Sequence, residues 1–106
     1  MTDKIVVFST CASEEEAARI ARLLVEGRLA ACVNVVPGAR SFYRWQGAVE
    51  STAEWMLVIK STRGRFEALR AELEKAHSYD VPEVVALPVV DGAPNYLSWI
   101  EESVSA

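Results

Sequence analysis

The stretch ACVNVVPGARSFYRWQGAVESTAEWMLVIK, residues 31–60, decides the fold. Both halves are rich in β-branched and aromatic residues, which favour strands, and Gln46-Gly47 between them is a turn-forming pair. Pro37-Gly38 predicts a bend in the first strand. The result is a hairpin of roughly 45–50 Å if it is fully extended at about 3.4 Å per residue. A domain of 106 residues cannot cover such a hairpin, so its tip must protrude or be covered by another chain.

Helices and strands alternate on both sides of this hairpin. Residues 4–10, KIVVFST, are a short apolar run that predicts a buried strand. Ser13 is expected to open a helix, because Glu16 stands three residues later at the spacing of a capping box, and Gly27 is placed to end it. After the hairpin, a second helix is predicted from about Arg63 to His77.

The last third of the chain predicts one more strand and a short helix. Val81-Pro82 cannot continue the second helix, and Glu83 to Val90 is interpreted as a second buried strand. Asp91-Gly92 is a turn, and Pro94 suits the first turn of a final helix. The order β-α-β-β-α-β-α predicts an α+β fold of one domain, residues 1–106. Its first six elements are those of a ferredoxin-like sandwich, a four-stranded antiparallel sheet with two helices on one face.

Composition and charge narrow the classes of partner and compartment. The net charge is −4 and the basic residues are scattered, so nucleic acid is not an expected partner. No apolar stretch reaches the ~20 residues of a membrane span, and the N-terminus lacks the layout of a signal peptide. Cys11 and Cys32 make no disulfide framework, which indicates the cytoplasm. Apolar residues are 51% of the chain, so some apolar surface is expected between subunits.

Known catalytic and metal motifs are absent from the sequence. His77 is the only histidine, and there is no CxxC or HxxxH pair for a closed zinc site within one chain. Cys11 precedes the Ser13 cap, where a helix N-terminus can lower the pKa of a thiol, but a buried or half-buried thiol is the favoured interpretation of both cysteines. Without a G-x-S-x-G elbow or a Gly-rich phosphate loop, no enzyme is predicted. A small hydrolase stays open as a third, less favoured class.

Four separated segments resemble one known family, CutA, the divalent-cation tolerance family. They are LAACVNVVPGARSFYRWQGAVES, EWMLVIKST, HSYDVPEVVALPV and NYLSWI, in order along nearly the whole chain. The resemblance implies a ferredoxin-like protomer in a tight homotrimer, with an architecture related to the PII signalling proteins. It also implies a cytoplasmic protein tied to tolerance of copper and other divalent metals, with no settled catalytic activity.

The resemblance also suggests a metal ligand. The proposed copper ligands of the family are a cysteine in the first strand and neighbouring histidines before a Tyr-x-x-Pro-Glu motif. His77 matches one histidine, whereas Ala76 stands in place of the other. Ser9 stands at the position of the strand cysteine, with Cys11 displaced by two residues. The expectation is therefore a weakly bound divalent ion, copper, at His77, or else a structural role for this histidine.

A ligand cleft between subunits is the second expectation. Edge-to-edge pairing of the hairpins would remove exposed sheet edges and cover aromatic residues. The clefts are predicted to bind a metal ion or a small anionic ligand. In the alternative, the protein is a PII-like regulatory module that binds an anionic metabolite, and metal effects are indirect. The residues expected to gather in the clefts are Lys60, His77, Tyr79, Glu83, Trp45 and Tyr96.

Overall fold

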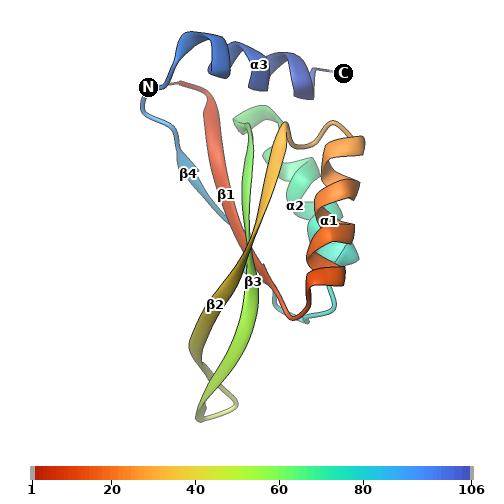
Figure 1. The fold of residues 1–106 in the computed structure, drawn as a ribbon, viewed down its shortest axis with the longest axis vertical. Helices are drawn as coiled ribbons and strands as arrows, with labels where there is room; N and C mark the ends of the chain where they lie inside the picture. Colours follow the sequence, from red (N-terminus) through yellow and green to blue (C-terminus); the bar gives the residue numbers. More distant parts are fainter. Residues whose placement is uncertain (1, 106) are drawn as a thin grey trace.

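The computed structural model describes residues 2–105, which form one four-stranded antiparallel sheet with three α-helices (Figure 1). The strand order in the sheet is β2-β3-β1-β4. Helices α1 and α2 cover one face of the sheet, and α3 lies across one end of it (Figure 1). The α+β class and the predicted order of elements are confirmed. The elements are β1 (Lys4–Cys11), α1 (Glu14–Glu26), β2 (Cys32–Trp45), β3 (Ala48–Thr62), the 3-10 helix η1 (Arg63–Arg65), α2 (Phe66–Ala76), β4 (Val85–Pro88) and α3 (Pro94–Val104).

Helix α1 begins where the capping spacing predicts. The Glu16 N–H donates to Ser13 Oγ at 3.1 Å, which satisfies one of the free donors of the first turn. Glu14, Glu15 and Glu16 place three carboxylates beside the positive end of the helix dipole. The cap uses only the backbone of Glu16, and its carboxylate instead accepts the Ser78 N–H at 2.8 Å, just after the end of α2.

The core lies between the sheet and helices α1 and α2. Side chains alternate along β1, so every second residue from Ile5 to Cys11 faces the helices and is buried. On this face of β1, Ser9 is the one hydroxyl among Ile5, Val7 and Cys11. The fully buried large side chains of this core are Val7, Ile20, Leu24, Leu57, Ile59, Leu69 and Leu73.

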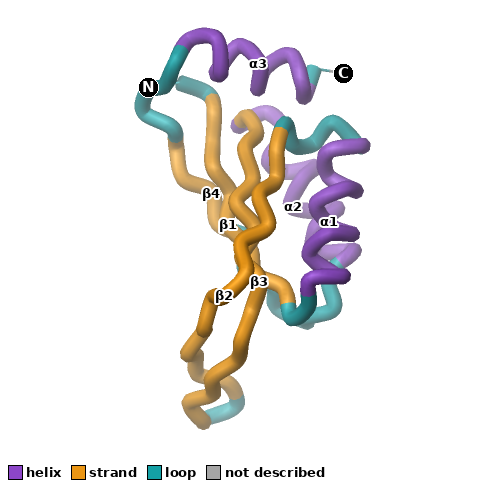
Figure 2. Tube along the Cα trace, viewed as in Figure 1, coloured by secondary structure: helices purple, strands orange, loops and turns teal. Residues whose placement is uncertain are grey.

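The hairpin of β2 and β3 is the most prominent feature of the protomer (Figure 2). Its turn at Gln46-Gly47 has positive φ at both residues, 50° and 83°, which suits a tight hairpin turn. A register shift between Val36 and Ala39 marks the bend at Pro37-Gly38. Both predicted features are confirmed. The protomer extends 44 × 25 × 23 Å, because the tip of the hairpin projects beyond the helices.

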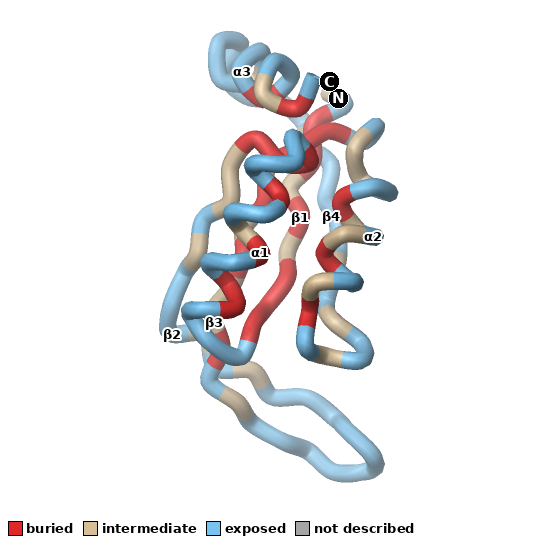
Figure 3. Tube along the Cα trace, turned by 90° about the vertical axis from the view of Figure 1, so that its right-hand side faces the viewer, coloured by how far each residue is buried: buried red, intermediate tan, exposed pale blue. Residues whose placement is uncertain are grey.

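Most residues of the projecting part of the hairpin are exposed (Figure 3), and several of them are apolar. Phe42 is 68% exposed, Val49 67% and Trp45 42%. The last predicted strand also lies at the surface, so its interpretation as a buried strand from Glu83 to Val90 is wrong. Only Val85–Pro88 forms β4, and all four residues are exposed. The reason is its place at the edge of the sheet, where it pairs with β1 alone.

Candidate functional site

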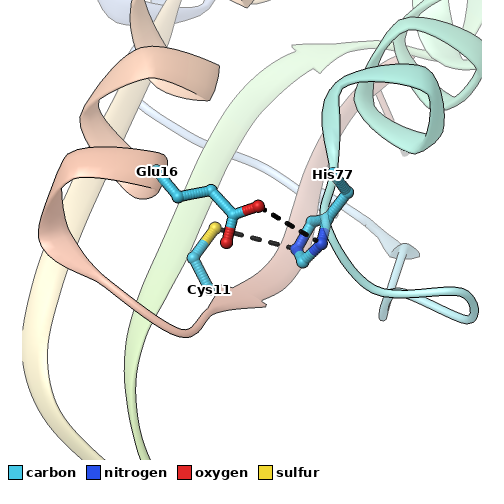
Figure 4. A group of neighbouring side chains, drawn as sticks. All are labelled: Cys11, Glu16 and His77. Carbon is cyan, nitrogen blue, oxygen red and sulfur yellow. Dashed lines mark hydrogen bonds and ion pairs between the residues drawn. The ribbon is translucent and has the colours of Figure 1, made fainter.

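Three potential metal ligands meet where β1 ends beneath the helices (Figure 4). Cys11 is the last residue of β1, Glu16 lies in the first turn of α1, and His77 caps the C-terminus of α2. Cys11 Sγ lies 3.8 Å from His77 Nε2, and Glu16 Oε2 lies 3.8 Å from His77 Nδ1. The ligand atoms of all three residues are within 4.8 Å of one another, and all three residues are buried. We call this group the Cys11–Glu16–His77 cluster.

Both ring nitrogens of His77 have hydrogen-bond partners. Nε2 lies 2.8 Å from the carbonyl oxygen of Thr10, and Nδ1 accepts the Tyr79 N–H at 3.1 Å. These partners assign the proton to Nε2 and the lone pair to Nδ1, which describes a neutral imidazole. The ring also packs against Tyr79, with centroids 4.7 Å apart. These contacts are the ones expected for the structural role that was predicted as one alternative for His77.

The two other members of the cluster have shifted pKa values. Burial raises the pKa of the Cys11 thiol to about 12, and the nearby charges of Glu16 and Glu54 act in the same direction. Desolvation opposes ionisation of Glu16, but hydrogen bonding by Ser78, whose N–H donates at 2.8 Å, keeps its pKa below the usual value. The cluster thus holds a protonated thiol, a neutral imidazole and a carboxylate. The favoured interpretation of Cys11 as a buried thiol is confirmed, and burial raises its pKa where a helix N-terminus alone would lower it.

The same arrangement has the order of a thiol–imidazole–carboxylate triad, yet it lacks the properties of a nucleophile. Cys11 is fully buried, and its pKa favours the thiol over the reactive thiolate. The Nε2 proton of His77 points at the Thr10 carbonyl, so this nitrogen has no free lone pair to accept the thiol proton. The geometry gives no support to cysteine-based hydrolysis.

As a ligand set, the cluster suits a borderline or soft divalent ion. Thiolate and imidazole are ligands of copper and zinc, and a carboxylate supplies the oxygen of a mixed site. Ser9 Oγ is fully buried and has no hydrogen-bond partner among residues 2–105. Ser9 precedes Cys11 by two residues and therefore lies on the same face of β1. An ion could therefore find three ligands and a free hydroxyl on the same strand face, provided that the thiol proton leaves and His77 gives up one of its two present hydrogen bonds.

Sequence reasoning placed His77 in the site but missed the other two ligands. The displacement of the cysteine from position 9 to position 11 looked like a lost ligand. Because strand side chains alternate, a shift of two residues keeps the thiol on the same face, and Cys11 Sγ lies 3.8 Å from the imidazole. Glu16 was recognised only as a capping residue. Its three-residue spacing from Ser13 was the available signal, since it fixes the side chain at the helix start.

A cavity of about 750 Å³ lies between the outer part of the hairpin and the loop after α2, next to the cluster. Three residues of the predicted cleft, Trp45, Tyr79 and Glu83, line it. The Tyr79 hydroxyl donates to Glu54 Oε2 at 2.7 Å, and desolvation together with this carboxylate raises the pKa of Tyr79 well above its usual range. The full lining is Thr10, Ser41, Phe42, Tyr43, Arg44, Trp45, Glu50, Glu54, Tyr79, Asp80, Val81 and Glu83.

The other residues of the predicted cleft do not line this cavity within one chain. His77 lies behind the Tyr79 ring. Lys60 bonds Asn34 and stands six residues from Glu54 along β3, which is about 20 Å of extended strand. Tyr96 lies on α3 and packs against Trp99 with centroids 5.5 Å apart. A single cleft containing all six residues would need a neighbouring protomer and stays a prediction.

These features define a class: a small α+β domain with an antiparallel sheet and a buried sulfur, nitrogen and oxygen ligand cluster. The family model described as CutA1 divalent ion tolerance protein matches residues 5–103. The chain is 50% identical over 98 residues to the divalent-cation tolerance protein CutA of Thermus thermophilus, covering 92% of this chain and 95% of that relative. The chain belongs to the CutA family.

Solved structures agree with this assignment. The fold matches the crystal structure of CutA from Xylella fastidiosa with a TM-score of 0.96 and 43% identity, covering 98% of this chain and 100% of that one. It matches the structure described as periplasmic divalent cation tolerance protein CutA from Archaeoglobus fulgidus with a TM-score of 0.94 and 38% identity, covering 96% and 99%. Because one relative is described as periplasmic, the expected cytoplasmic location stays a proposal. None of the helices within residues 2–105 is long and apolar enough to cross a membrane.

Proposed function

We propose that this protein acts in divalent-cation tolerance and is not an enzyme. It is a cytoplasmic homotrimer, in which ferredoxin-like protomers assemble with a PII-like architecture. Each protomer binds a divalent metal ion, with copper preferred, at the Cys11–Glu16–His77 cluster, beside a ligand cleft between subunits. The family assignment supports the tolerance role. The observation that carries metal binding is the cluster itself, three buried ligand types within 4.8 Å of one another.

The exposed apolar hairpin supports assembly. Phe42 and Val49 are each about two-thirds exposed in the single chain, at 68% and 67%. Val85 and Leu87 of the edge strand β4 are half exposed. Apolar patches and open sheet edges of this kind are normally covered by another chain. Light scattering at micromolar protein should give a mass near three chains, and a clean monomer would contradict both the trimer and any cleft between subunits.

Copper is favoured by the chemistry of the ligands. Copper lies at the top of the general affinity order of divalent metals, and thiolate and imidazole suit it. Binding has a cost here, because the ion must displace the thiol proton and compete with the bond from His77 Nε2 to Thr10. The affinity should therefore be modest. It should also fall as the pH drops, because protons compete with the ion for the imidazole and the thiolate.

The test is calorimetric titration of the wild type, His77→Ala and Cys11→Ser with Cu(II) at neutral pH. Cys32→Ser is the matched control, because Cys32 is the second free cysteine and lies outside the cluster. Both cluster variants should bind at least about tenfold more weakly, as expected when one of three ligands is lost. Co(II) gives a second readout, since a thiolate-to-metal absorption band should appear in the wild type and vanish in Cys11→Ser. Equal binding in all four proteins would refute the metal site.

A further inference from the structure

The cavity between the outer part of the hairpin and the loop after α2 has a strongly unequal charge. Four of its lining residues are carboxylates, Glu50, Glu54, Asp80 and Glu83, and Arg44 is its one cationic side chain. Three negative charges are therefore in excess on its walls. A cavity with walls of one sign concentrates ions of the opposite sign. This sign is the reverse of what the anionic metabolite of the sequence-based expectation would need.

Glu54 is the most informative of the four carboxylates. Its residue is only 5% exposed, although it lies in the wall of the cavity. Its side chain accepts a hydrogen bond from the Tyr79 hydroxyl, and it forms no ion pair with a cation in the described part of the chain. A buried carboxylate is normally paired with a cation or metal. The counter-charge for Glu54 is missing from the protomer and would be supplied by a bound ligand.

Aromatic side chains form the rest of the wall. Phe42, Tyr43, Trp45 and Tyr79 all line the cavity. Aromatic faces attract ammonium and guanidinium groups, and Trp and Tyr are the strongest of them. The hairpin already shows this preference, because the guanidinium carbon of Arg40 lies 5.6 Å from the centroid of the Phe42 ring. Aromatic rings beside carboxylates are a combination that suits a cation with an apolar body.

We propose that this cavity binds an organic cation, an ammonium or guanidinium group carried on an apolar body. The charged end lies between Glu54, Asp80 and Glu83, and the apolar part packs on the aromatic rings of the hairpin. A bare metal ion could not use the rings, and an anion would face the excess negative charge. The inference rests on the ligand cleft of the proposed function, whose ligand it identifies by class. It does not rest on the Cys11–Glu16–His77 cluster.

The experiment uses 2-phenylethylammonium as the probe and phenylacetate as its counterpart of similar shape and opposite charge. Each is titrated into the protein by calorimetry at low salt, and the fluorescence of its three tryptophans, of which Trp45 lines the cavity, is followed in parallel. The ammonium probe should bind saturably and the carboxylate should not. Glu83→Gln and Asp80→Asn should each weaken the probe about fivefold, as expected for one charge pair near 4 Å in a water-like medium. Raising the salt concentration should weaken binding further.

Two control variants keep the result specific. Glu102→Gln removes an exposed carboxylate of α3, outside the cavity, and should leave the probe's affinity unchanged. Cys11→Ser should also leave it unchanged, so that failure of the metal hypothesis and failure of this one can be told apart. Equal binding of both probes, or no saturable binding of the ammonium up to about 10 mM, would overturn the proposal.

A basic side chain of a neighbouring copy is the other source of the same chemistry. In that case the ammonium probe would not bind, and Glu83→Gln would lower the stability of the oligomer instead. Thermal unfolding of Glu83→Gln and Glu102→Gln at several protein concentrations separates the two sources. A concentration-dependent decrease in melting temperature that occurs only in Glu83→Gln, together with no binding of the ammonium probe, would overturn the small-molecule proposal.

Discussion

Replacement of His77 by alanine tests whether the imidazole supports the fold, and its cost follows from the structure. The side chain has no exposed surface, and it makes two hydrogen bonds, to the Thr10 carbonyl and from the Tyr79 N–H. Each contributes about 1 kcal/mol net, and the contact with the Tyr79 ring adds about 0.5–1.5 kcal/mol. The space left behind and the unpaired Thr10 and Tyr79 groups add more. We expect a loss of about 3–5 kcal/mol in the free energy of unfolding.

The assay is urea unfolding at two or more protein concentrations, because assembly contributes to apparent stability. His77→Gln is the matched variant, since its amide retains a donor and an acceptor and should lose less than His77→Ala. A loss below about 1 kcal/mol in His77→Ala would refute the reasoning, because surface substitutions already fall in that range. A large loss of stability with unchanged Cu(II) binding would leave His77 a structural residue and remove it from the metal site.

Three further predictions concern the cluster, the cavity and the hairpin. In Cys11→Ala, the free energy of unfolding should fall less steeply at alkaline pH than in the wild type. The raised pKa of the Cys11 thiol contributes stability that is fully present below pH 9.0 and is lost as the pH rises toward about 12. Unfolding followed from pH 8 to 11 should show this difference. Tyr79→Phe should lower the free energy of unfolding by about 1.5–3 kcal/mol, because it leaves the buried Glu54 carboxylate without its hydrogen bond. The loss should be smaller in a Glu54→Gln background, and a double-mutant cycle of melting curves measures the difference. Trp45→Asp should weaken assembly by several kcal/mol if a neighbour covers the ring; an unchanged mass and melting temperature would place Trp45 at a free tip.

Local chemistry explains why most of the fold could be predicted. The Ser13 cap, the Pro37-Gly38 bend and the Gln46-Gly47 turn each depend on neighbouring residues, and each was found in the structure. The exposed edge strand was missed for the opposite reason. Val85–Pro88 is as apolar as a buried strand, and only its place at the end of the sheet order decides its exposure. Sheet order depends on contacts between distant segments, which an apolar run does not reveal.

The site shows the same division between local and distant information. His77 could be proposed because it is the only histidine and matches a motif. Its closeness to Cys11 depends on contacts across 66 residues of sequence, which bring the end of α2 onto the end of β1. The alternation of β1 would have allowed a partial prediction, since it places Ser9 and Cys11 on one face. The cavity required the bent hairpin and the loop after α2 together, so only Trp45, Tyr79 and Glu83 were foreseen among its lining residues.

The cluster and the cavity share one short segment, His77 to Tyr79, which offers a physical route for coupling between them. An ion at His77 must alter the bonds that now hold the imidazole, and one of these comes from the Tyr79 N–H. Tyr79 in turn holds Glu54 through its hydroxyl, in the wall of the cavity. If metal occupancy changes the affinity of the cavity for a cation, the cation must change the metal affinity by the same factor, because coupling between two binding equilibria is reciprocal. Tyr79→Phe breaks the link to Glu54 without touching a cluster ligand, and therefore should reduce this coupling while metal binding persists.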